Sequence, residues 1–144
     1  AVELALERAV GDGRAPIAEE LVALETAFWM DGPGQPPDRV PADLRDALMA
    51  MDRDHLTPGR VEGRPIRMTP VANDRIADLR CPVLAVAGEL DASEVAQTAW
   101  YLEANAPDAK AVILPGVAHM IGMEVPRELA GLIIDFLAPL PRWA

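Results

Sequence analysis

The sequence is poor in cysteine, in positive charge and in long apolar runs. One cysteine among 144 residues leaves no internal disulfide, which favours a reducing compartment, and we expect a cytoplasmic protein. Lys and Arg number 13 against 23 Asp and Glu, so the net charge is −10. This acidity disfavours binding to nucleic acid or to an anionic membrane surface. No apolar run approaches the roughly 18 residues that span a membrane, so no membrane segment is expected.

The apolar residues that are present predict an α/β protein. Hydrophobic residues make up 51% of the chain and charged residues 25%, which is typical of a soluble globular domain. Two short apolar runs, at about 82–87 and 110–114, have the β-branched content of parallel strands buried on both faces. A helical stripe lies between them, and Ser93 is expected to be its N-cap. A second stripe, from Leu129 to Leu137, predicts a final helix.

A polar residue follows each of the two predicted strands. Asp91 comes just after the first strand and His119 just after the second. Open parallel sheets place their ligands and their chemistry at the carboxyl ends of the strands. We therefore expect Asp91 and His119 to converge, with a carboxylate oxygen within about 3.2 Å of His119 Nδ1.

The residues around this pair resemble the C-terminal half of the α/β-hydrolases. Gly88 to Asp91 matches the G-x-x-D pattern of the family's catalytic acid, and Pro115 to His119 matches the P-G-x-A-H pattern of its histidine. Glu124-Val125-Pro126 resembles the E-x-P that opens the family's last helix. The resemblance implies a partial α/β-hydrolase fold with Asp91 and His119 as catalytic residues. It implies neither a metal nor an organic cofactor.

The nucleophile of such a triad is missing from the sequence. No G-x-S-x-G is present, and the one serine, Ser93, lies two residues after the presumed acid. The first residue is Ala1 rather than methionine, so we expect a C-terminal part of a longer protein, with the missing N-terminal half of the fold as its partner. The chain alone is expected to be inactive.

The resemblance also implies how the chain is divided. Helical stripes fill the first part, so residues 1–53 are expected to form a helical cap. Residues 54–78, rich in proline, glycine and arginine, are expected to be a return linker. Residues 79–144 would then form the C-terminal part of the hydrolase core.

The expected activity is hydrolysis of a small carboxylic ester, lactone or related acyl compound. A non-catalytic binding protein of the same fold is the alternative, and an epoxide, haloalkane or carbon–carbon bond hydrolase also remains open. Three further residues are given structural explanations. His55 is expected at a solvated helix end, Cys81 in core packing, and Glu124 at a helix start favoured by the dipole.

Overall fold

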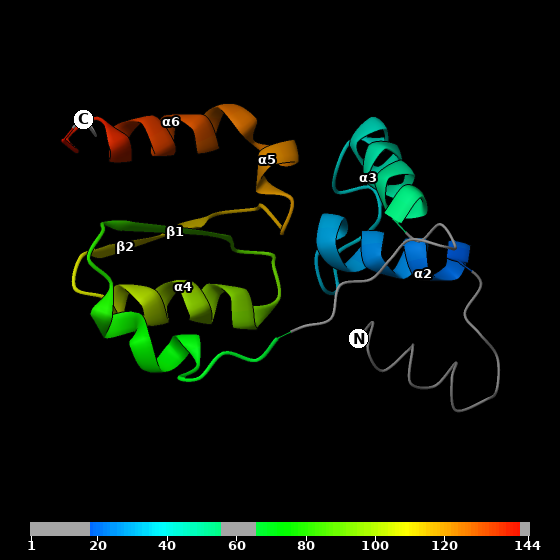
Figure 1. The fold of residues 1–144 in the computed structure, drawn as a ribbon. Helices are drawn as coiled ribbons and strands as arrows, with labels where there is room; N and C mark the ends of the chain where they lie inside the picture. Colours follow the sequence, from blue (N-terminus) through cyan, green and yellow to red (C-terminus); the bar gives the residue numbers. More distant parts are fainter. Residues whose placement is uncertain (1–17, 56–65, 142–144) are drawn as a thin grey trace. The chain divides into compact units, whose positions relative to one another are not determined.

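The computed structural model describes residues 18–55 and 66–141, and the chain divides into two units between positions 64 and 65 (Figure 1). The start of the predicted cap and residues 56–65 of the predicted linker lie outside the described residues. None of the described helices is long and apolar enough to cross a membrane.

The first unit is helical. Helix α2 (Ala18–Glu25) continues into a π-helical turn, η1 (Thr26–Asp31), and helix α3 (Ala42–His55) follows a loop. Gly32 ends the helical run with a φ of 94°, a conformation that glycine adopts without steric cost. The helices on both sides of this break agree with the helical stripes expected in this part of the chain, whereas the π-helical turn has no signal in the periodicity.

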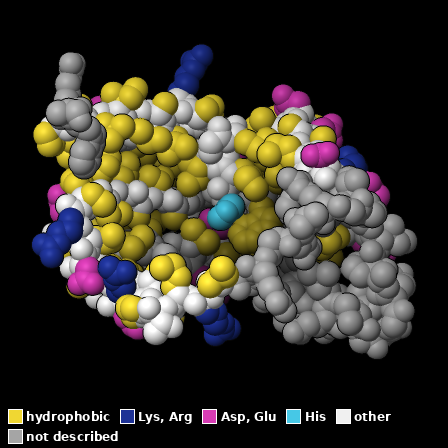
Figure 2. Space-filling model, viewed as in Figure 1, with side chains coloured by type: hydrophobic (Ala, Val, Ile, Leu, Met, Phe, Trp, Pro, Cys, Tyr) yellow, Lys and Arg dark blue, Asp and Glu magenta, His cyan; other side chains and the backbone are white. Residues whose placement is uncertain are grey.

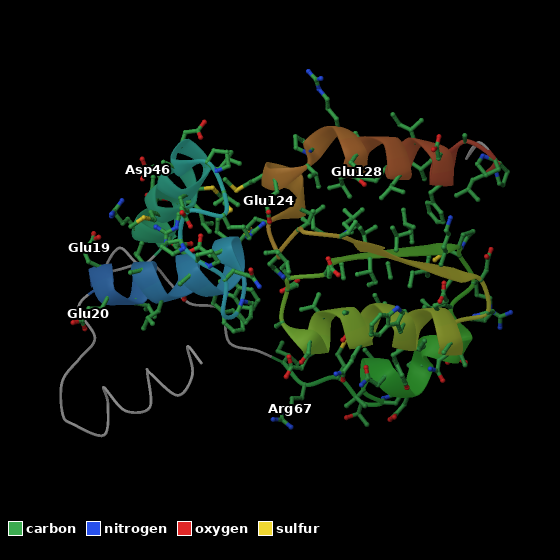
Figure 3. All side chains as sticks on the ribbon, turned by 180° about the vertical axis from the view of Figure 1, so that it is seen from behind. Glu19, Glu20, Asp46, Arg67, Glu124 and Glu128 are labelled. Carbon is green, nitrogen blue, oxygen red and sulfur yellow. The ribbon has the colours of Figure 1, made fainter. Side chains whose placement is uncertain are left out.

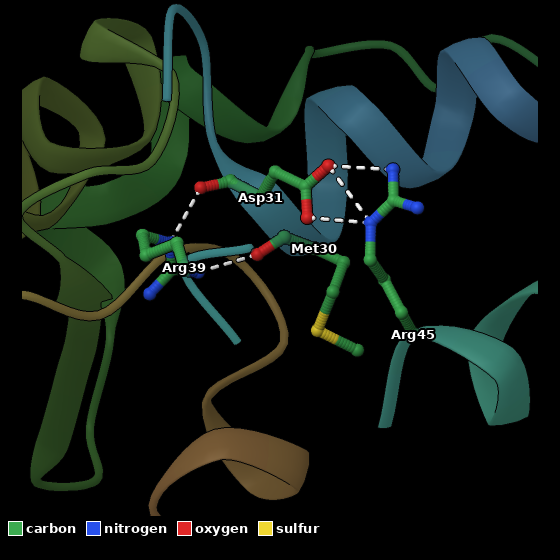
Figure 4. Close-up of polar contacts among 4 residues, drawn as sticks. All are labelled: Met30, Asp31, Arg39 and Arg45. Carbon is green, nitrogen blue, oxygen red and sulfur yellow. Dashed lines mark hydrogen bonds and ion pairs between the residues drawn. The ribbon is translucent and has the colours of Figure 1, made fainter. Parts of the chain in front are cut away.

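A buried ion pair joins the two sides of that loop (Figure 4). The carboxylate of Asp31, with only 2% of its side chain exposed, accepts hydrogen bonds from Arg45 Nε at 2.9 Å and from Nη2 at 2.8 Å. This pairing raises the pKa of Arg45. Arg39 donates to the main-chain oxygens of Met30 and Asp31. Arg39 from the loop and Arg45 from α3 therefore both bind residues at the carboxyl end of the π-helical turn.

A second, exposed ion pair connects α3 to α2. Arg53 donates to both carboxylate oxygens of Glu19, at 2.8 and 3.0 Å. The hydrogen bonds from Arg53 lower the pKa of Glu19. Both side chains are about half exposed, so solvent screens this pair much more than the one at Asp31.

The second unit is a β-α-β-α arrangement. Strands β1 and β2 pair in parallel, from Val83 opposite Ala109 to Gly88 opposite Leu114. Helices α4 and α6 lie on opposite faces of this pair (Figure 1). The elements of the unit are η2 (Ala72–Asp78), β1 (Val83–Gly88), α4 (Ser93–Asn105), β2 (Ala109–Leu114), α5 (Ile121–Glu124) and α6 (Pro126–Leu137). The predicted α/β class and both strands are confirmed.

Two structural expectations in this unit are wrong. Ser93 is not the N-cap of α4, because Ala92 holds the non-helical position and Ser93 is already helical; its hydroxyl donates to Glu94 instead. Cys81 is exposed rather than packed in the core, because β1 begins only at Val83 and leaves Cys81 outside the strand.

Large apolar side chains remain exposed on the second unit. Ile134 and Leu137 of α6 are 64% and 53% exposed, and Trp100 of α4 is 53% exposed. Figure 2 shows hydrophobic side chains gathered over α6 and the strands on one face of this unit. These side chains belong to the helices that cover the strands, and exposed apolar patches of this kind often mark a surface that packs against another segment or partner.

Candidate active site

Asp91 lies in the turn that follows β1. Its carboxylate is almost completely buried, with 1% of the side chain exposed. Oδ1 accepts a hydrogen bond from the main-chain N–H of Ala92 at 2.7 Å, at the start of α4. This bond fixes the orientation of the carboxylate and leaves Oδ2 available for a second hydrogen bond.

His119 meets that second oxygen. The distance between His119 Nδ1 and Asp91 Oδ2 is 2.8 Å, although the two residues are 28 positions apart in the chain. The predicted convergence of the two residues is therefore confirmed. A carboxylate can only accept, so Nδ1 carries the proton in this bond. The imidazole itself is 40% exposed, so a reacting group can reach it from the surface of the second unit.

The two loops of the site lie in direct contact. The N–H of Leu90, next to Asp91, donates to the main-chain oxygen of Val117 at 2.9 Å. Gly88 approaches the His119 loop so closely that a Cβ there would lie 2.2 Å from the Val117 oxygen and 2.3 Å from that of Ala118. Glycine is therefore required at position 88 by space, and the motif G-x-x-D has a geometric reason here.

Two further carboxylates bind the His119 loop and were not predicted. Glu89 Oε2 accepts from the N–H of Gly116, and Glu124 Oε1 accepts from the N–H of Ala118, both at 2.9 Å. Glu124 lies at the end of the four-residue helix α5, two residues before α6 begins, and the helix-start explanation did not include the bond of its carboxylate to the loop. The E-x-P motif marks Glu124 in the sequence, but the motif does not indicate which main-chain N–H its carboxylate binds.

Of the remaining residues considered from the sequence, Ser93 is described and does not contact Asp91 or His119 through its hydroxyl. Ser93 lies on the exposed first turn of α4, where its hydroxyl binds Glu94. The side chain of His55 lies outside the described residues. In residues 18–55 and 66–141 no group of His, Cys, Asp and Glu is arranged to hold a metal ion. A hollow of about 850 Å³ lies along residues 67–79, and neither Asp91 nor His119 lines it.

The geometry of the pair is that of a general base. With the proton on Nδ1 held by Asp91, the neutral imidazole has its lone pair on Nε2, where it can accept a proton from a hydroxyl. The buried carboxylate can stabilise the imidazolium that then forms. The arrangement is thus suited to proton transfer to and from a reacting group.

Comparison with known proteins assigns the fold. No protein-family model and no curated protein matches the chain. Proline iminopeptidase from Mycobacterium smegmatis is 26% identical, with a TM-score of 0.52 over 95% of this chain and 47% of that one. VinJ is 18% identical, with a TM-score of 0.56 over 97% of this chain and 48% of that one. MenH from S. aureus is 20% identical, with a TM-score of 0.52 over 69% of this chain and 38% of that one.

These structures are α/β-hydrolases. The present chain is related to that superfamily, has part of its fold and spans less than half the length of each of the three.

Proposed function

We propose that this chain contributes the acid and the histidine of a nucleophile–His–acid triad. The observation that carries the proposal is the 2.8 Å contact between His119 Nδ1 and the buried carboxylate of Asp91. The proposed reaction is hydrolysis of a small carboxylic ester, lactone or related acyl compound, without a metal or an organic cofactor. The proposed location is the cytoplasm, in keeping with a chain of 144 residues that has one cysteine.

In this mechanism His119 Nε2 removes the proton of the nucleophile as it attacks the acyl carbon. Asp91 holds Nδ1–H, keeps the imidazole in the required tautomer and stays ionised while the imidazolium forms. The imidazolium then gives its proton to the leaving group, and the cycle repeats with water. The bond from Ala92 to Asp91 Oδ1 keeps Oδ2 aimed at the imidazole throughout.

The nucleophile and the oxyanion hole would come from outside this sequence. In the described residues β1 pairs only with β2, so its other edge is open for a further strand. The related structures are more than twice as long as the matched part. We propose that the N-terminal half of the fold pairs with that edge, and that residues 1–53 act as its cap and 54–78 as the return linker.

The same fold also serves other functions, and these are the alternatives. The sequence has no G-x-S-x-G. A fold whose missing half also lacked a nucleophile would be a non-catalytic binding protein. An aspartate in that position would instead give an epoxide or haloalkane hydrolase, and a serine could also serve carbon–carbon bond hydrolysis.

The test has two stages. The coding sequence upstream of Ala1 is read first, and we expect a strand–G-x-S-x-G–helix segment in it. The longer protein is then assayed with p-nitrophenyl acetate. We expect His119→Ala to lower kcat by several powers of ten and Asp91→Asn by about four, because the imidazole takes the wrong tautomer.

His55→Ala is the matched control, since His55 is the chain's other histidine, and it should change kcat little. Full activity in His119→Ala would remove the pair from the mechanism. An upstream sequence without any nucleophile would support the binding protein instead.

A further inference from the structure

The loop that carries His119 has little of its own with which to hold a fixed shape. Between Pro115 and His119 it consists of Gly116, Val117 and Ala118, none of which has a polar side chain. Ala118 is completely buried and directly precedes His119. The main-chain groups of this loop must therefore be satisfied by residues from other parts of the second unit.

Bonds from both sides of the loop do this. On the side of β1, Leu90 N–H donates to the Val117 oxygen and Glu89 accepts from Gly116 N–H. On the other side, Glu124 accepts from Ala118 N–H at 2.9 Å. The first two bonds hold the beginning of the loop, whereas the Glu124 bond is made one residue from the imidazole.

The Glu124 bond closes a short ring of chain around His119. The main-chain oxygen of His119 accepts a hydrogen bond from the N–H of Ile121 at 2.9 Å. Ile121 is the first residue of α5, and Glu124 is the last. The carboxylate then returns to the residue before His119. A bond from an N–H to a charged carboxylate is stronger than one to a neutral acceptor, and here it lies partly buried. The side chain of Glu124 thus ties the residue before His119 to the short helix that follows His119.

We infer that Glu124 is a positioning residue for His119, and that its carboxylate keeps the imidazole on Asp91 by holding the Ala118 amide. The inference rests on the proposed function, because positioning matters for a histidine that transfers protons. It assigns Glu124 no contact with substrate. A displacement of about 1 Å at a catalytic group can cost about a hundredfold in rate, so a loop without this anchor should be a poor base.

The fold offers a matched control. Glu128 lies four residues further along, in the first turn of α6, where it is exposed (Figure 3). It carries the same charge and lies in the first turn of the helix that follows Glu124. Glu128→Gln should therefore leave the His119 loop unaffected.

The first measurement is NMR of the imidazole protons in the full chain. There are two histidines, so His55→Gln identifies the signals of His119. We expect a downfield, slowly exchanging Nδ1–H signal in the unchanged protein, in Glu124→Gln and in Glu128→Gln. Glu124→Ala, and Glu124→Asp whose carboxylate is one methylene short, should lose it. A signal with unchanged position and exchange rate in either of these two variants would overturn the inference.

The second measurement is kinetic and uses the longer, active protein, with kcat counted per folded molecule. Glu124→Ala and Glu124→Asp should lower kcat by about ten- to a hundredfold and leave KM within about twofold. Glu124→Gln, which can still accept from Ala118, should recover kcat to within about threefold. Unchanged kcat in Glu124→Asp beside a large loss in His119→Ala would overturn the positioning role alone. Unchanged kcat in His119→Ala would overturn the proposed function itself.

Discussion

Gly88 is the residue at which the two loops of the site come closest. Its backbone φ is not positive, so an alanine could adopt its conformation, and the obstacle is the space occupied by two main-chain oxygens. Main-chain atoms cannot rotate aside as the end of a side chain can. A methyl group there must push the His119 loop away from β1.

We expect Gly88→Ala to lower the free energy of unfolding by about 1–3 kcal/mol, as overpacking does. In the active longer protein it should lower kcat at least tenfold, because His119 moves with its loop. Gly131→Ala is the control: an added methyl group would meet no atom within 4 Å, and an alanine inside α6 should stabilise the helix by up to about 1 kcal/mol. Thermal unfolding and kcat measured side by side check both. Equal stability in the two variants would contradict the steric argument.

At the residue scale the sequence predicts the pair but not its supports. Asp91 and His119 each follow an apolar run, and the rule that parallel strands end at one edge brings them together. Glu89 and Glu124 escape prediction because each binds a main-chain amide in another segment. Every non-proline residue of the loop has the same main-chain N–H donor, so the sequence cannot show which of them a carboxylate binds. Only the folded structure shows this.

At the scale of helices, the buried carboxylate of Asp31 connects the π-helical turn to α3 in the first unit. It ends the π-helical turn and is neutralised by Arg45, whose side chain is 25% exposed against 2% for Asp31. The two partners are therefore unequal: if its partner is removed, Arg45 can still be hydrated, whereas Asp31 cannot.

We expect Arg45→Met to cost about 3 kcal/mol or more of unfolding free energy, because it leaves a buried unpaired charge. Asp31→Asn should cost less, about 1–2 kcal/mol, since the amide oxygen still accepts a bond and Arg45 reaches water. Urea unfolding gives both values. Arg53→Met, at the exposed pair with Glu19, is the control and should change the midpoint little. A larger loss in Asp31→Asn than in Arg45→Met would contradict this order.

The helices and strands themselves could be predicted because their apolar residues repeat at the period of the element. Helix α6 begins at Pro126 and α3 just after Pro41, as proline favours at a helix start. The π-helical turn and the true start of α4 could not be predicted. The start of α4 depends on which of two adjacent residues adopts a non-helical backbone, and Ala92 and Ser93 do not differ enough in periodicity to decide that. The π-helical turn follows α2 without a break in the helical backbone, since Glu25 stays in the right-handed helical region, so apolar periodicity does not mark where it begins.

In the second unit the Asp91–His119 contact lies at the end of a two-stranded parallel sheet. The described residues supply two parallel strands, two covering helices and exposed apolar side chains such as Ile134. The fold class could be predicted from the sequence because it depends on local patterns.

The last prediction concerns the chain by itself. A triad without its nucleophile loses about a millionfold in turnover, so residues 1–144 alone should hydrolyse p-nitrophenyl acetate no faster than an exposed imidazole does, and His119→Ala should make little difference. Adding the N-terminal half of the proposed longer protein, either joined to Ala1 or as a separate chain that pairs with the open edge of β1, should restore turnover. In the restored protein, but not in the chain alone, His119→Ala should then abolish it. Rapid turnover that depends on His119 in the chain alone would show that the nucleophile lies within these residues.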